Sequence, residues 1–167
     1  MPGYYYAQGR KVPMSLDHSR IAVDPLRAEK AGMKGLAEGK KHVTLPGGLV
    51  IMNRRDLSPS LLEDLERAGA IQGVYRQGES ATFVPAPEIR IEIDSSEQGK
   101  AVRRVLASTH IGADIVDETK DRFVVRPKSG RGDDAIDLAN EVTEKAKPGM
   151  SSARMLQVIE HPDVTRR

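Results

Sequence analysis

The sequence predicts an α+β fold made of two tandem units with antiparallel sheets, and three observations support this fold class. The chain has 167 residues, which suits two units of about 70 to 80 residues. Strand and helix patterns occur twice in the order strand, helix, strand, strand, helix, strand, which is the ferredoxin-like order. A join that contains two prolines separates the two series, at residues 82–88. Because the series share little sequence identity, the repeat depends on the order of the patterns.

The join between the units contains Pro85 and Pro87. Proline fixes its own φ and has no amide hydrogen, so we expect neither a helix nor a central strand to pass through this segment. Directly after it, isoleucines alternate with charged residues over positions 88–93, which is the period of a strand with one buried face. We therefore expect one unit to end near Val84 and the next to begin near Glu88.

The first unit is predicted to cover residues 20–84, after an N-terminal arm of residues 1–19. Both of its helices have clear start signals, because Asp24-Pro25 and Ser58-Pro59 each place a capping side chain before a proline. In chain order we expect a short strand at 11–14 in the arm, a strand at 20–23, a helix from 25 toward Gly35 or Gly39, strands at 42–45 and 49–52 around a Pro-Gly-Gly turn, a helix at 58–68 and a closing strand at 71–77.

The second unit is predicted to cover residues 88–161, followed by a C-terminal tail of residues 162–167. Its second helix is expected to have Asp133 or Asp134 as its cap and to stop at Pro148-Gly149. In chain order we expect a strand at 88–93, a helix at 96–110 capped by Ser95 or Ser96, a hairpin with strands at 113–116 and 123–125, a helix at 133–146 and a last strand at 155–160.

The composition excludes several classes of protein. A net charge of +2, with 24 acidic residues, favours interpreting the paired basic residues as ordinary solvated charge. Two phenylalanines, four tyrosines and no tryptophan offer little for base stacking, so we expect no nucleic acid partner. The absence of cysteine excludes a disulfide and a thiolate nucleophile. Since neither a signal peptide nor a long apolar run is found, we expect a cytoplasmic protein without membrane contact.

No group of residues in the sequence predicts chemistry. The four histidines are not spaced as metal ligands, and no Gly-x-Ser-x-Gly pattern is present. Gly47-Gly48 and Gly130-Arg131-Gly132 do not match a phosphate-binding loop, so both are interpreted as turns. The sequence therefore predicts a protein that is not an enzyme, with no catalytic residue, no metal and no cofactor.

Three consecutive tyrosines, Tyr4, Tyr5 and Tyr6, give the arm its concentrated apolar area. One interpretation, which we favour, is that they pack back on the domain. The other is that they contact a partner, because tyrosine is enriched at protein interfaces.

Several short motifs together resemble the N-terminal prodomains of bacterial subtilisin-like serine proteases of the fervidolysin type. These motifs are GRKVPMSLDHSRIAV at 9–23, LPGGLV at 45–50 and the proline-containing join before EIRI at 88–91. The resemblance spans most of the chain. It implies a ferredoxin-like fold whose sheet packs on the protease, assists its folding and leaves a C-terminal strand in the active-site cleft as a product-like inhibitor.

The resemblance also implies which residues meet the partner. The segment that would enter the cleft is His161, Pro162, Asp163, Val164, Thr165, Arg166 and Arg167. Because no catalytic domain follows it, we expect a stand-alone prodomain-like protein that acts in trans on a subtilisin-like protease as inhibitor or folding chaperone. Pro162 and the basic ending differ from the small or apolar ending of many such prodomains. This difference leaves open a non-catalytic adaptor that binds a non-protease partner through its sheet surface or through Tyr4 to Tyr6.

Overall fold

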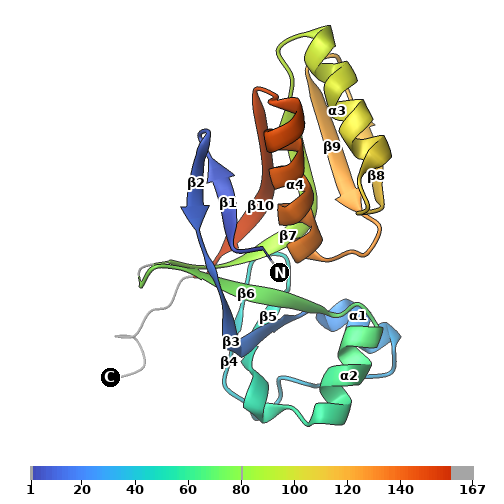
Figure 1. The fold of residues 1–167 in the computed structure, drawn as a ribbon. Helices are drawn as coiled ribbons and strands as arrows, with labels where there is room; N and C mark the ends of the chain where they lie inside the picture. Colours follow the sequence, from blue (N-terminus) through green and yellow to red (C-terminus); the bar gives the residue numbers. More distant parts are fainter. Residues whose placement is uncertain (1, 80, 159–167) are drawn as a thin grey trace.

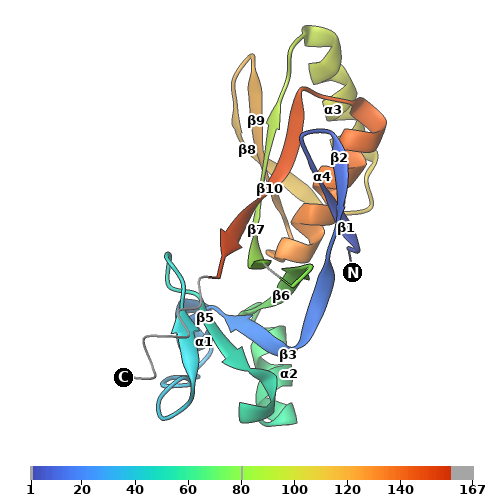
Figure 2. The ribbon, with the colours of Figure 1, turned by 90° about the vertical axis from the view of Figure 1, so that its left-hand side faces the viewer.

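The computed structural model describes residues 2–79 and 81–158. Over these residues, four α-helices pack on an antiparallel sheet (Figure 1), so the α+β class is confirmed. Figures 1 and 2 show the two halves of the chain placed end to end, with strand β7 passing from one half into the other. The division of the chain into units at residues 84–88 stays a prediction.

The first half follows the predicted order of elements. Both predicted helix caps are confirmed, because the Asp24 carboxylate accepts hydrogen bonds from the first turn of α1 and the Ser58 hydroxyl accepts one from the Leu61 amide. The elements are β3 (Ser15–Val23), α1 (Pro25–Lys30), β4 (His42–Thr44), β5 (Val50–Asn53), the short 3-10 helix η1 (Arg54–Asp56), α2 (Pro59–Arg67) and β6 (Ile71–Gln77).

Helix α1 is shorter than expected, because it ends at Lys30 instead of continuing toward Gly35 or Gly39. Gly32 and Gly35 have φ angles of +88° and +65°, which an α-helix does not contain. The chain turns there, and Met33 and Leu36 pack on the core of the first half from a loop.

The second half also contains the predicted elements. The last strand is longer than predicted, because it begins at Met150, where serines and alanine pair with the end of β7. The elements are β7 (Ala81–Glu92), α3 (Ser96–Ser108), β8 (Ala113–Glu118), β9 (Arg122–Pro127), α4 (Gly132–Ala146) and β10 (Met150–Gln157).

The cap of α3 is confirmed as Ser95, whose hydroxyl accepts a hydrogen bond from the Gln98 amide. The predicted cap of α4 is wrong. Arg131 occupies the cap position without a side-chain cap bond, and Asp133 lies inside the first turn. Its carboxylate is bound by Tyr75 and Arg131 instead, so it is not free to cap the helix.

The two halves share one eight-stranded sheet in the described chain. The strands lie in the order β4-β5-β3-β6-β7-β9-β8, and β10 pairs along the other side of β7. Every pairing is antiparallel. The halves are joined where β6 meets β7, with Tyr75 opposite Phe83.

The expectation that no central strand passes through Pro85 and Pro87 is wrong, because β7 contains both and has strands on each side. On one side, β6 pairs with residues 81–83 and β9 with residues 89–92, so the prolines lie in the gap between the two neighbours. On the other side, the register with β10 shifts between Ala153 and Met155. Pro87 therefore falls where the ladder is interrupted on both sides, and Pro85, opposite Met155, lies at the edge of this interruption.

The N-terminal arm forms a hairpin of β1 (Tyr4–Ala7) and β2 (Arg10–Pro13), which agrees with the strand expected near residue 11. Strand β3 begins at Ser15, earlier than the strand expected at residues 20–23, and it pairs with β6 from its first residue. In Figures 1 and 2 the hairpin lies beside α4 and β10.

Apolar residues gather in three clusters. The largest lies between the sheet of the second half and helices α3 and α4, and includes Ile89, Ile91 and Phe123. A second cluster lies under α1 and α2 in the first half. The third covers the opposite face of the first half's sheet. Tyr75 belongs to the cluster of the second half although β6 lies in the first, so the halves share buried contacts.

Candidate functional site

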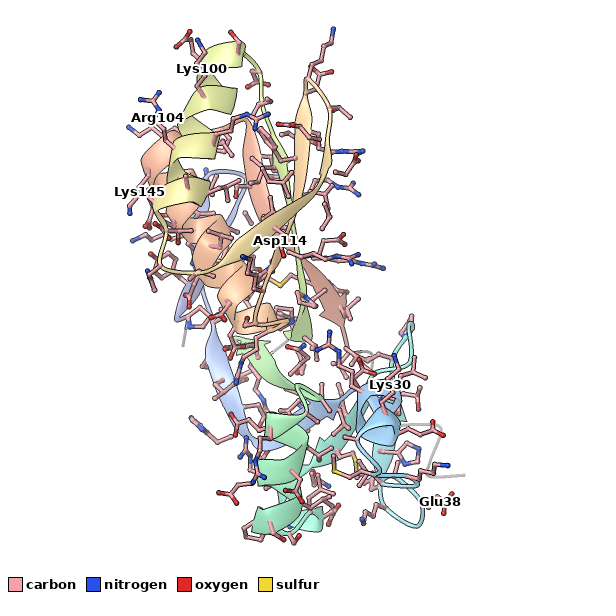
Figure 3. The ribbon with its side chains drawn as sticks, turned by 90° about the vertical axis from the view of Figure 1, so that its right-hand side faces the viewer. Lys30, Glu38, Lys100, Arg104, Asp114 and Lys145 are labelled. Atoms are coloured by element: carbon pink, nitrogen blue, oxygen red, sulfur yellow. The ribbon has the colours of Figure 1, made fainter. Side chains whose placement is uncertain are left out.

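The second half leaves one face of its sheet free of helices. On β7, Ile89 and Ile91 are fully buried beneath α3 and α4, so the residue between them, Arg90, points to the opposite side. In Figure 3 the two helices lie on one side of this half, and side chains of the strands extend from the other side. We call this helix-free side the open face, and it consists of Glu88, Arg90, Glu92, Arg122, Val124, Arg126, Met150, Ser152 and Arg154.

The corresponding face of the first half is covered. Ile51 and Val74 on that face are buried together with Leu45 and Val84, and Leu156 from β10 packs against them. A partner that docks on a sheet of this protein therefore finds accessible side chains on the second half.

The open face contains a shallow depression of about 380 Å³. Its lining mixes charged, hydroxyl and apolar side chains, namely Glu88, Arg90, Val124, Met150, Ser152 and Arg154. A neighbouring depression of about 400 Å³ lies where Arg27 and Gly130 approach Pro87 and Arg126. Small-molecule sites are mostly apolar clefts, so these charged depressions are better suited to contact with another macromolecule.

Ion pairs organise the outer part of the open face. Arg126 pairs with Glu88 at 3.6 Å, and Arg122 pairs with Asp117 of β8 at 3.2 Å. Within residues 2–79 and 81–158, the guanidinium groups of Arg90 and Arg154 make no hydrogen bond or ion pair. Two positive charges therefore remain available on the inner part of the face.

The three tyrosines pack back on the second half and on β6, as the packing interpretation predicts. The hydroxyls of Tyr4 and Tyr6 donate to the same Glu144 oxygen, at 2.7 and 2.8 Å. The Tyr5 hydroxyl donates to Gln77 at 2.9 Å, and its ring meets Phe83 edge to face. A role of these tyrosines in contacting a partner stays a prediction.

These hydrogen bonds shift the pKa values of Tyr4, Tyr6 and Glu144. The bond to Glu144 raises the pKa of Tyr6 to about 12, because it favours the protonated phenol. The same contact raises the pKa of Tyr4 above its ordinary value. In return, the two hydroxyl donors lower the pKa of Glu144. The hairpin is thus tied to α4 through a charged acceptor.

The predicted cleft-binding segment, residues 161–167, lies outside the described residues. The last described strand before this segment is β10, and Ser152 and Arg154 on β10 belong to the open face.

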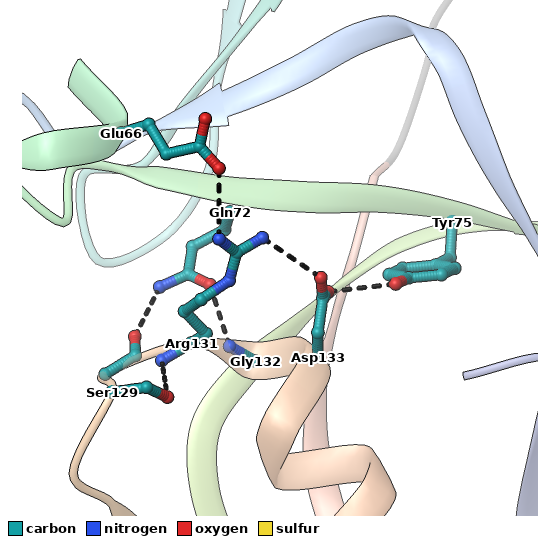
Figure 4. Close-up of polar contacts among 8 residues, drawn as sticks. Glu66, Gln72, Tyr75, Ser129, Arg131, Gly132 and Asp133 are labelled. Carbon is teal, nitrogen blue, oxygen red and sulfur yellow. Dashed lines mark hydrogen bonds and ion pairs between the residues drawn. The ribbon is translucent and has the colours of Figure 1, made fainter. Parts of the chain in front are cut away.

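A polar cluster between the halves was not predicted from the sequence (Figure 4). The Gln72 amide nitrogen donates to the Gly130 carbonyl at 2.8 Å, and the Gly132 amide donates to the Gln72 side-chain oxygen at 2.8 Å. The Gln72 side chain on β6 therefore satisfies the Gly130 carbonyl and the Gly132 amide at the start of α4.

Arg131 and Asp133 continue this cluster. Arg131 reaches Glu66 of α2 at 3.3 Å and Asp133 at 3.3 Å, and the buried Tyr75 hydroxyl donates to Asp133 at 2.9 Å. Burial, together with the Asp133 charge, raises the pKa of Tyr75 far above its ordinary range. Because these contacts join α2 and β6 to α4, we assign the cluster to holding the two halves in a fixed orientation.

The histidines lie on separate elements: His18 is exposed on β3, His42 is exposed on β4 and His110 is exposed in the loop after α3, while His161 lies outside the described residues. Over the described ranges, no group of histidine and carboxylate side chains is placed to hold a metal ion. In the same ranges no helix has the length and apolar character to cross a membrane. The prediction that the protein is not an enzyme stays a prediction.

Comparison of the chain with models of known protein families finds no match, and comparison with curated proteins finds none either.

Proposed function

We propose that this protein is a non-catalytic, prodomain-like module that binds a subtilisin-like serine protease as inhibitor, folding chaperone or both. Numbered within each half, the strands lie in the order 4-1-3-2, as β6-β3-β5-β4 and as β10-β7-β9-β8. This repeated order, with the βαββαβ succession of elements, supports two tandem ferredoxin-like units. The motifs that resemble fervidolysin-type prodomains support the choice of partner.

The observation that carries the proposal is the open face of the second half. A prodomain of this kind would place its sheet on the protease, and here one sheet face is free of helices and lined by side chains that reach solvent. The predicted cleft-binding segment follows β10, a strand of that face. An extended segment binds an enzyme by pairing its backbone with edge strands, while side chains fill alternate pockets.

Recovery of the partner tests the proposal. The tagged protein is incubated with lysate of its source organism, and the bound fraction is identified by mass spectrometry and assayed for protease activity before and after release. We expect a subtilisin-like enzyme that is inactive when bound and active when released. Reproducible recovery of a different protein, with no subtilisin-like protease, would contradict the proposal and favour the adaptor.

A deletion separates the cleft mechanism from docking alone. Removing residues 161–167 should weaken inhibition of the protease while leaving its capture intact, because the open face remains. The control is the Lys147→Ala variant, whose exposed side chain lies at the end of α4. Inhibition by the deletion variant that equals that of the full chain would rule out the cleft mechanism.

A further inference from the structure

Arg90 and Arg154 converge on one place in the open face. Arg90 lies on the central strand β7, directly between Val124 of β9 and Ser152 of β10 in the strand register. Arg154 follows Ser152 by two positions on β10, and both arginines line the depression of about 380 Å³. Each guanidinium is exposed, and neither makes a hydrogen bond or ion pair with the described residues.

The other cations around the face are already paired. Arg126, Arg122 and Lys128 each have a carboxylate within 4 Å, at 3.6, 3.2 and 3.9 Å. Covering the face with a protein surface would remove Arg90 and Arg154 from water, and leaving a charge unpaired in such a place is strongly unfavourable. A partner that docks here must therefore supply anionic groups opposite these two arginines.

The surroundings indicate which anion fits. Glu92 lies on the same face and makes no ion pair with the described residues, so a phosphate backbone with a charge at every nucleotide would meet more repulsion than a single carboxylate. Val124 and Met150 offer apolar contact for the methylene groups of an acidic side chain, and the Ser152 hydroxyl adds a donor. The planar guanidinium binds a carboxylate through two parallel hydrogen bonds. These features favour isolated aspartate or glutamate side chains on a protein.

We propose that Arg90 and Arg154 form a carboxylate-binding site that receives aspartate or glutamate side chains from the protein docked on the open face. The inference rests on the proposed function for its choice of docking face, and adds the chemistry by which the face selects its partner. The acidic region of the partner lies opposite the depression, and high salt slows association because it screens the attraction between the two exposed arginines and the approaching carboxylates.

The site is tested with the full chain and a short fluorescent peptide rich in glutamate, whose binding is followed by anisotropy. The variant R90Q/R154Q is compared with K100Q/R104Q, which removes the same charge from α3. Figure 3 shows Lys100 and Arg104 on the helix side of the second half, away from the open face. Thermal unfolding of each variant establishes that it is folded.

We expect R90Q/R154Q to bind the acidic peptide about tenfold more weakly than the wild type, as loss of two charge-assisted contacts implies. K100Q/R104Q should bind almost as the wild type does. Equal weakening by both variants, or no binding of the acidic peptide by the wild type, overturns the proposal. Tighter binding of a single-stranded oligonucleotide than of the peptide also overturns it.

A second variant, and a comparison of peptide binding with protease inhibition, complete the test. If R90Q/R154Q is unfolded, R90K/R154K takes its place, because lysine keeps the charge but loses the bidentate geometry. Binding by this variant about fivefold weaker than wild type supports the site, and unchanged binding overturns it. A chain that inhibits no subtilisin-like protease yet binds the acidic peptide through Arg90 and Arg154 refutes the proposed protease but keeps the carboxylate site.

Discussion

Gly132 lies so close to the backbone of Pro85 that it leaves no room for a side chain. A Cβ atom at this position would overlap the Pro85 carbonyl oxygen, and backbone cannot move aside as a flexible side chain can. We expect Gly132→Ala to lower the free energy of unfolding by about 3 kcal/mol, measured by urea denaturation. The control is Gly3→Ala, whose Cβ would meet nothing within 4 Å. Equal stability of the two variants would contradict the close approach.

Asp17 is a buried carboxylate that organises the irregular part of β3. It accepts hydrogen bonds from the Ser19 amide and hydroxyl and from Arg20 and Arg76, at 2.6 to 3.2 Å. Burial alone would raise the pKa of Asp17, but the bonds from Ser19 and Arg20 outweigh it and hold the pKa well below its usual range. Asp17→Asn should therefore destabilise the protein by about 2 kcal/mol at pH 7.

The pH dependence of this variant has a definite sign. Because the folded pKa of Asp17 is lowered, its contribution to stability is present above the unfolded value of about 3.9 and is lost as the pH falls further. The difference in unfolding free energy between wild type and Asp17→Asn should shrink below about pH 4. Asp121→Asn, at an exposed turn, serves as the control and should change stability little. A difference that does not depend on pH would contradict the role of the charge.

At the scale of elements, the N-terminal hairpin is held on α4 by the bonds from Tyr4 and Tyr6 to Glu144. The raised pKa of Tyr6 means that this contact stabilises the folded hairpin below about pH 10 and is lost as the pH rises toward 12. In Glu144→Gln the pKa of Tyr6 should fall back toward about 10, as measured by NMR titration of labelled tyrosine. Glu141→Gln, one turn earlier on α4, should leave it unchanged. A Tyr6 titration that is the same in Glu144→Gln would show that the tyrosines are not bound to α4.

Elements with local signals were predictable from the sequence. Asp24-Pro25, Ser58-Pro59 and Ser95 each mark a helix start through chemistry contained in a few adjacent residues. The path of β7 through Pro85 and Pro87 was not predictable in this way. Whether a proline breaks a strand depends on which neighbours pair beside it, and those neighbours are set by the tertiary fold.

The candidate site shows the same limit. The alternation in β7 already places Arg90 opposite the buried isoleucines, so half of the arginine pair follows from the sequence. Ser152 and Arg154 were missed, because the last strand was predicted to begin at residue 155 and a Ser-Ser-Ala stretch carries weak strand propensity. The cluster around Gln72 was missed because its members meet only in the folded chain, across 58 or more residues.

At the scale of the whole molecule, Gln72 connects the halves by satisfying the loop that leads into α4. Gln72→Ala would leave the half-buried Gly130 carbonyl and the buried Gly132 amide without their partner. We expect a loss of about 2 kcal/mol in unfolding free energy, together with faster hydrogen exchange at the start of α4. Gln157→Ala, at an exposed position on β10, is the matched control. If hydrogen exchange at the start of α4 is the same in Gln72→Ala as in the wild type, the cluster does not hold the two halves in a fixed orientation.

We propose that the protein binds and restrains a subtilisin-like protease, and one titration tests this directly. The purified full chain is added stepwise to subtilisin-like proteases of its source organism, and peptide hydrolysis by the protease is followed. We predict that activity falls in proportion to added protein until one equivalent is bound, with weaker inhibition by the chain that lacks residues 161–167. Full protease activity in the presence of excess protein, with no complex on size-exclusion chromatography, would contradict the account.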